Sequence, residues 1–131
     1  MKSKRYDDGL ALRRQVLGSE YVDRSLASAD EFGGPLQELV TEYCWGAVWG
    51  REELPTKTRS MLNLAMLTAL NRPHELKIHV RGALRNGCTQ EEIREVLLQT
   101  AIYCGVPAAI DAMRTAREAL KDFERETAEA K

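Results

Sequence analysis

The stretch that decides the fold is LPTKTRSMLNLAMLTALNRPHELKIHVRGALRNG, residues 54–87. It contains two helical patterns, because Pro55 and Pro73 stand where a first helical turn begins and Gly87 stands where the second helix ends. The first helix, over about residues 55–71, is apolar nearly all round beyond its first turn. A helix without a polar face is buried on all sides, so in a chain this short we expect a partner subunit to supply part of its cover.

The rest of the chain also has helical spacing, and no useful length of it alternates with a period of two. Thr89 and Glu92 form a capping-box pattern, and Gly105 and Pro107 end the helix that follows it. Asp23 is expected to cap a short helix. We therefore predict an all-α protein with a single domain, residues 1–131. Besides the two above, the expected helices cover about residues 6–17, 23–30, 35–48, 89–104 and 109–123.

The helix that begins at Pro35 carries an apolar face, and Trp45 and Trp49 fall on its opposite side. Two indoles that lie away from a core face need another surface to cover them. We favour a subunit interface or a neighbouring loop as that cover, and the alternative is that they form a wall of a binding pocket. The predicted inner face consists of Leu36, Leu39, Val40, Tyr43, Cys44, Ala47 and Val48.

Composition excludes several function classes. The chain is 44% hydrophobic and 30% charged with a net charge of −1, so it lacks the positive field that a nucleic-acid or acidic-membrane partner needs. No apolar run approaches the ~20 residues of a membrane span, and no secretory signal is present, which predicts a cytoplasmic protein. Cys44, Cys88 and Cys104 form no CxxC motif and are expected to be reduced and mostly buried.

The second helix of the opening stretch carries the candidate chemistry. Glu75, His79, Gly82 and Asn86 fall on one line of its surface. A carboxylate one turn before an imidazole is a proton-handling pair, although the same spacing also occurs in surface pairs of marginal value. Metal binding is the weaker alternative, because the chain offers no second ligand cluster. Motifs for nucleotide binding and serine hydrolysis are absent from the sequence.

Residues 54–60, 71–83 and 86–109 resemble the carboxymuconolactone decarboxylase family, and the similarity extends over nearly the whole chain. The same superfamily contains AhpD-like peroxidases, which carry a CxxC motif followed by a histidine. Here Arg72 and Glu75 stand where the two cysteines would be, and His79 stands in the histidine position. Thiol–disulfide chemistry needs two sulfur atoms within bonding distance, so the resemblance is to the decarboxylase branch.

This resemblance implies an AhpD-like bundle of about six or seven helices with a central antiparallel helical hairpin. It also implies a homohexamer, a trimer of dimers, with active sites near subunit boundaries. The implied reaction converts 4-carboxymuconolactone to 3-oxoadipate enol-lactone and CO2, in the protocatechuate branch of the beta-ketoadipate pathway of aromatic hydrocarbon catabolism. No metal or organic cofactor is implied, since the lactone carbonyl of the substrate can itself accept the electrons.

Such a substrate assigns tasks to particular residues. Arg59 is our first choice for binding a carboxylate of this dianion, followed by Arg72 and Arg81, because a guanidinium binds a carboxylate with two hydrogen bonds. His79 is the expected proton donor or oxyanion partner, with Glu75 orienting it or relaying the proton. Trp45 or Trp49 would close the pocket against water. These last two residues complete the predicted site.

Three alternatives to the decarboxylase stay open at this point. One is a paralogue that acts on another small lactone or carboxylate with the same proton-handling pair. Another is residual peroxidase activity that depends on the cysteines. The third is a helical assembly module without catalysis.

Overall fold

The computed structural model describes residues 2–130, which are helical and contain no strand, as the all-α prediction requires. The chain divides into two compact units, Met1–Thr56 and Lys57–Lys131. That residues 1–131 form a single domain stays a prediction. No helix within the described range is both long and apolar enough to cross a membrane.

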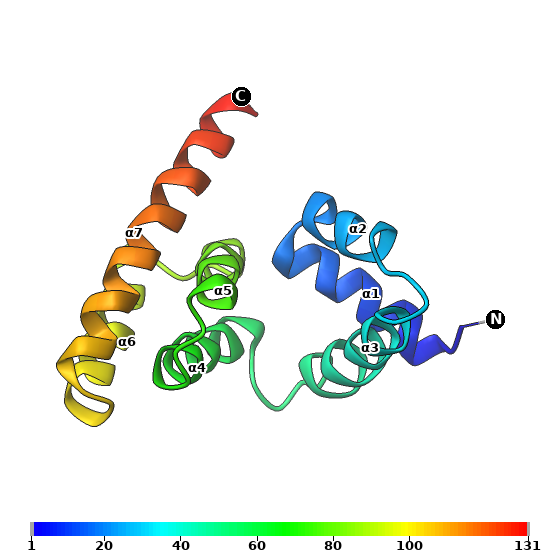
Figure 1. The fold of residues 1–131 in the computed structure, drawn as a ribbon, viewed down its shortest axis with the longest axis horizontal. Coiled ribbons are helices and arrows are strands. Elements are labelled where there is room, and N and C mark those ends of the chain that lie inside the picture. The colour runs from blue at the N-terminus through cyan, green and yellow to red at the C-terminus, as the bar shows by residue number, and fades with distance from the viewer. Residues whose placement is uncertain (1, 131) are drawn as a thin grey trace. The chain divides into compact units, whose positions relative to one another are not determined.

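The N-terminal unit contains four helices, and Figure 1 labels the three α-helices among them. Its corner after the first helix is Gly18, whose φ of 92° is favourable for glycine alone among the ordinary residues. The following helix begins at Ser19, so the prediction that Asp23 caps it is wrong. Asp23 instead accepts two hydrogen bonds from the Arg14 guanidinium. The elements are α1 (Lys4–Leu17), α2 (Ser19–Ala27), α3 (Gly34–Leu39) and the π-helix η1 (Val40–Trp49).

The predicted inner face of residues 36–48 is wrong. Thr41, Trp45 and Trp49 are the buried residues of η1, whereas most of the large side chains expected inside are half exposed or more. The reason is the backbone: α3 continues directly into a π-helix, whose turns are wider than those of an α-helix, so a pattern read at 3.6 residues per turn selects the wrong face. The large exposed residues are Leu36, Leu39, Tyr43 and Val48.

The C-terminal unit is built around one apolar core. Its elements are α4 (Thr56–Ala69), α5 (Pro73–Arg85), α6 (Gln90–Tyr103) and α7 (Val106–Glu129). The three corners between them contain Asn71, Gly87 and Gly105, all with positive φ. The predicted capping box at Thr89 and Glu92 is present. The core consists of Leu64, Leu76, Val80, Ala83, Cys88, Ile93, Leu97, Ala112, Ala116 and Ala119.

Within one chain α4 is not covered on all sides. Leu62 and Met66 are exposed, as is Leu70 directly after the helix, although Leu64 is fully buried in the core. The prediction that the cysteines are mostly buried is wrong. All three thiols are free, but only Cys88 is buried, and Cys44 and Cys104 are exposed. Cys44 belongs to the misassigned face of η1.

Candidate active site

The residues predicted to carry the chemistry lie along one flank of α5. Leu76, Val80 and Ala83 enter the core, and this fixes the orientation of the helix. Consequently Glu75 is exposed on the first turn, and His79 is half-buried one turn later. The predicted alignment of these two side chains on the same side of the helix agrees with this placement.

Two polar residues of α4 meet this flank. The Asn63 side-chain amide nitrogen lies 3.4 Å from Nδ1 of His79, and the Asn86 side-chain amide donates to Oγ of the fully buried Ser60 over 2.9 Å. These contacts show that α4 and α5 run antiparallel, as the predicted helical hairpin requires. Sequence reasoning did not assign a role to Asn63 or Ser60. The available signal was that both are polar residues at or inside an otherwise apolar helix.

The electrostatics of the site make His79 neutral near pH 7. Burial lowers the pKa of His79 from its ordinary value of 6.5 to about 4, and the negative charge of Glu75 opposes this effect only in part. A neutral imidazole has one nitrogen that donates a hydrogen bond and one that accepts. His79 therefore suits hydrogen-bond donation to a developing negative charge better than transfer of a proton from an imidazolium.

Of the three predicted substrate-binding arginines, Arg59 is the one on the helix that contacts His79. It is half-buried on α4, one turn before Asn63. Arg72 is exposed at the corner before α5, where its guanidinium donates to the carbonyl oxygens of Leu70 and Asn71 over 3.2 and 3.3 Å. None of these contacts tests whether either arginine binds substrate.

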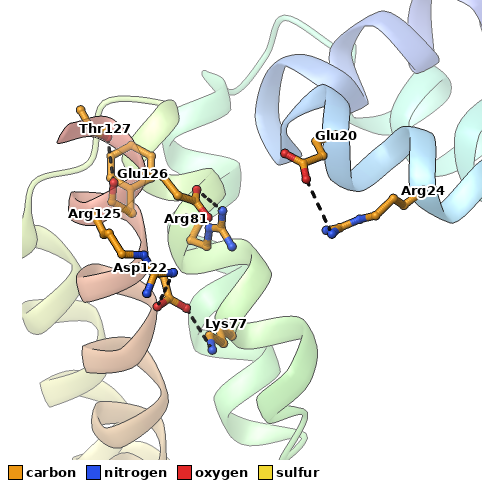
Figure 2. Close-up of polar contacts among 9 residues, drawn as sticks. Glu20, Arg24, Lys77, Arg81, Asp122, Arg125, Glu126 and Thr127 are labelled. Carbon is orange, nitrogen blue, oxygen red and sulfur yellow. Dashed lines mark hydrogen bonds and ion pairs between the residues drawn. The ribbon is translucent and has the colours of Figure 1, made fainter. Parts of the chain in front are cut away.

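Arg81, the third predicted arginine, takes part in a ladder of ion pairs between α5 and α7 (Figure 2). It pairs with Glu126, and Lys77 pairs with Asp122 over 3.2 Å and with Glu118 over 3.8 Å. These acids follow one another at four-residue spacing and therefore lie on one side of α7. The ladder occupies a different edge of α5 from His79, and it gives Arg81 a structural partner within the chain.

Trp45 and Trp49 belong to η1 in the N-terminal unit. Their rings stack with centroids 4.5 Å apart and planes at 24°, and both residues are almost completely buried, at 3% and 5% exposure. The chain thus covers both indoles without a partner subunit. Their predicted contact with substrate stays a prediction.

No group of three or more His, Cys, Asp or Glu residues in the described range could hold a metal ion. An apolar groove of about 420 Å³ lies between α4 and α6. The residues lining it include Met61, Leu62 and Tyr103. This groove contains neither Glu75 nor His79 and is a separate feature of the C-terminal unit.

The amino-acid sequence was compared with those of known proteins and protein families. The model of the carboxymuconolactone decarboxylase family matches residues 34–118. The chain belongs to this family. It is 45% identical over 118 residues to a nitrosuccinic acid decarboxylase of Metarhizium robertsii, covering 90% of this chain and 82% of that protein. It is 41% identical over 120 residues to a 4-carboxymuconolactone decarboxylase of Acinetobacter baylyi, covering 92% and 90%. With two decarboxylases among its relatives, the family member described here is a carboxy-lyase.

Proposed function

We propose that this decarboxylase converts 4-carboxymuconolactone to 3-oxoadipate enol-lactone and CO2 without a metal or organic cofactor. The observation that carries the proposal is the half-buried, neutral His79 one turn after the exposed carboxylate of Glu75 on α5. The similarity to the Acinetobacter baylyi enzyme supports the choice of substrate. In this proposal the product belongs to the protocatechuate branch of the beta-ketoadipate pathway.

The reaction can be balanced with groups of the substrate and one proton. The carbon–carbon bond to the departing carboxylate breaks, CO2 leaves, and the electron pair moves through the ring double bond into the lactone carbonyl. The resulting dienolate carries its charge on that oxygen. A proton then forms a bond to the α carbon, which restores the carbonyl and gives the enol-lactone. The substrate is its own electron sink, so the protein has to bind a dianion, stabilise an oxyanion and deliver one proton.

The site residues divide these tasks. His79 donates a hydrogen bond to the lactone oxygen, because a ring that is neutral at pH 7 keeps an N–H group for this purpose. Glu75 relays the proton from solvent to the substrate, consistent with its exposure on the first turn of α5. Arg59 binds a substrate carboxylate, since it is one helical turn from Asn63 and thus on the His79 side of α4. Arg72, Arg81 and the two tryptophans complete the proposed set with smaller roles.

A second substrate is supported by the 45% identity to the nitrosuccinic acid decarboxylase. Nitrosuccinate is also a dicarboxylate, and its nitro group can take up the electron pair left by CO2 to form a nitronate. Protonation of the carbon then completes the reaction. Both substrates need the same oxyanion partner and the same proton, so the geometry of α5 serves either of them.

We also propose a cytoplasmic homohexamer, a trimer of dimers, whose contacts cover the apolar surface of α4. Leu62, Met66 and Leu70 are exposed in one chain, and Leu62 borders the groove against α6. The three free cysteines are compatible with a reducing compartment. Analytical ultracentrifugation tests the assembly: a single species of six chains supports it, and a stable monomer at micromolar concentration contradicts it.

The function is tested by measuring CO2 release from authentic 4-carboxymuconolactone and from nitrosuccinate. We expect His79→Gln and Glu75→Gln to lower turnover about 10²–10⁴-fold. The exposed His74 on the same helix is a matched control, and His74→Gln should stay within about threefold of the parent. Turnover of neither substrate would exclude the proposal, and full activity of His79→Gln would remove His79 from the mechanism.

A further inference from the structure

Asn63 is a polar residue between Leu62 and Leu64 on α4, and its amide nitrogen lies 3.4 Å from Nδ1 of His79. We propose that Asn63 is a positioning residue: it donates a hydrogen bond to Nδ1 of His79 and thereby fixes the ring in the tautomer that carries its proton on Nε2. The proposal rests on the proposed function for its catalytic meaning, but the tautomer itself can be measured without substrate.

The direction of this hydrogen bond follows from the atoms that meet. In this placement the Asn63 NH₂ group faces Nδ1, and because an NH₂ group can only donate, the proposed bond requires the ring nitrogen to offer its lone pair. If Nδ1 carried the proton, the amide would have to turn by 180° so that Oδ1 accepts from the ring, and this is the arrangement that the proposal excludes. A separation of 3.4 Å is long for a hydrogen bond, and catalytic hydrogen bonds commonly shorten when substrate binds.

The packing around Asn63 keeps its amide in this place. Leu64, the next residue, is fully buried in the core and fixes the rotation of α4. One turn earlier, Ser60 accepts the hydrogen bond from Asn86 and sets how far α4 is displaced along α5. A shift of α4 that carried Asn63 away from His79 would have to break both of these contacts.

The charged groups near His79 come from both helices, and on α4 Arg59 lies on the His79 side, one turn before Asn63. On α5 the group that acts on His79 is Glu75, whose negative charge favours the protonated ring. Lys77 and Arg81 of the same helix are engaged with the acids of α7. The Asn63 amide is itself neutral, so its contact leaves the ring neutral and acts on where the single proton resides.

This assignment deepens the mechanism in one respect. With Nδ1 occupied, the N–H group of the neutral ring is on Nε2, and this group donates to the oxygen that becomes negative as CO2 leaves. A lactone oxygen and a nitro oxygen are both suitable acceptors. The substrate class is therefore a dicarboxylate whose departing carboxylate is joined to a carbon conjugated with such an oxygen acceptor.

The test is ¹⁵N NMR of the two histidines in the full-length protein at about pH 7, with His74→Gln used to assign the signals. We expect Nε2 of His79 to be protonated and Nδ1 to be unprotonated. In Asn63→Asp the carboxylate should draw the proton to Nδ1 and raise the pKa of His79 by about one unit or more. In that variant we expect kcat to fall about tenfold or more while KM changes by less than about threefold.

Two further variants separate positioning from packing. Asn63→Leu keeps the side-chain volume but removes the donor, so His79 should lose its single tautomer while circular dichroism shows an intact fold. Thr68→Val removes a buried hydroxyl group of α4, which donates to the Leu64 carbonyl oxygen, without touching the ring, and it should leave the His79 spectrum unchanged. A parent spectrum with the proton on Nδ1, or an Asn63→Asp spectrum identical to it, would overturn the proposal.

The outcome for Asn63 is distinguishable from the outcome for the proposed function. If neither substrate is decarboxylated while the tautomer and its response to Asn63→Asp are as expected, the proposed substrates are wrong and Asn63 still positions the ring. If CO2 is released while His79 carries its proton on Nδ1, the decarboxylase stands and the role of Asn63 is refuted.

Discussion

The two units of this chain bring their helices together in opposite ways. In the N-terminal unit, α1 approaches η1 so closely that a Cβ atom at Gly9 would collide with the carbonyl oxygen of Thr41 and lie 2.7 Å from the amide nitrogen of Gly46. In the C-terminal unit the helices meet through side chains such as Leu64, which fill a common core. Helix packing in the N-terminal unit therefore requires a glycine without a side chain at the contact, whereas helix packing in the C-terminal unit requires large apolar side chains.

This difference indicates where between helices a site of polar side chains can form. A close backbone contact leaves little room for functional side chains between the helices. Helices separated by leucines and valines leave a flank where polar residues are held at fixed spacing, as Asn63 and His79 are. Four measurements test this difference between the units, from the largest expected effect to the smallest.

The largest effect is expected for Gly9→Ala. The added methyl group must push α1 away from η1, and we expect a loss of about 3 kcal/mol or more in the free energy of unfolding. Urea unfolding followed by tryptophan fluorescence measures it, since both tryptophans lie in η1. Gly34→Ala is the control, because a Cβ atom at Gly34 meets nothing within 4 Å. Equal stability of the two variants would refute the close-approach argument.

A smaller effect should come from His79 in the C-terminal unit. The pKa of His79 is about 4 in the folded chain against an ordinary 6.5, so between these values the unfolded chain binds a proton that the folded chain does not. The stability that the neutral ring contributes is complete above about pH 6.5 and is lost as pH falls toward 4, by roughly 2–3 kcal/mol. The measurement is the pH dependence of urea unfolding for the parent minus that for His79→Gln. A difference that is flat over this range contradicts the burial of His79.

Arg13 in the N-terminal unit gives the third measurement. It is only 5% exposed and donates to Oγ1 of Thr41 over 3.1 Å, but its Nε has no hydrogen-bond partner. Burial lowers the pKa of Arg13, and the groups that oppose this effect are Tyr21, Cys44 and Tyr6 rather than a carboxylate. Because the buried charge is poorly compensated, Arg13→Met should keep or increase the stability, by up to about 1 kcal/mol.

The matched comparison is Arg13→Ala, which removes the charge but also leaves a cavity and should destabilise the chain. Thermal unfolding of both variants beside the parent is sufficient. A loss of more than about 2 kcal/mol in Arg13→Met would show that the guanidinium contributes net stability to the N-terminal unit.

The smallest effect is expected in the α5–α7 ladder. Arg81 and Glu126 are both partly exposed, so removing the pair should cost only about 0.2–1 kcal/mol, and less in high salt. A double-mutant cycle of Arg81→Gln and Glu126→Gln measures the coupling. The same Arg81→Gln variant also tests the predicted substrate contact: a large rise in KM for the dicarboxylate would show that Arg81 binds substrate despite its partner.

Sequence reasoning was most successful where local rules decide the structure. The capping box at Thr89 and the corner at Gly87 follow from short-range spacing, and both are confirmed. The alignment of Glu75 with His79 has the same origin. These features need no knowledge of the partner helices.

The remaining features depend on tertiary contacts or on an irregular backbone. Nothing in the periodicity of α4 indicates that Asn63 meets a ring 16 residues away, and nothing in that of α5 indicates that Arg81 pairs with an acid 45 residues away. The predicted inner face of η1 was wrong because a π-helix has more residues per turn than an α-helix, and no residue type in that segment indicates a π-helix. The buried charge of Arg13 is likewise invisible in one helix, since its burial comes from the approach of η1 to Gly9.

The ladder also constrains how this protein can change in length. Each residue of an α-helix advances the side chains by about 100°, so one residue inserted between Glu118 and Glu126 would turn the later acids away from Lys77 and Arg81. An insertion directly after Glu118 would also rotate Ala119 and Leu120 away from the core, so insertions and deletions there should be rejected more strictly than most single substitutions. Extra turns added after Glu126 leave the angular phase intact, so this helix can be extended at its C-terminal end without disturbing the unit it belongs to.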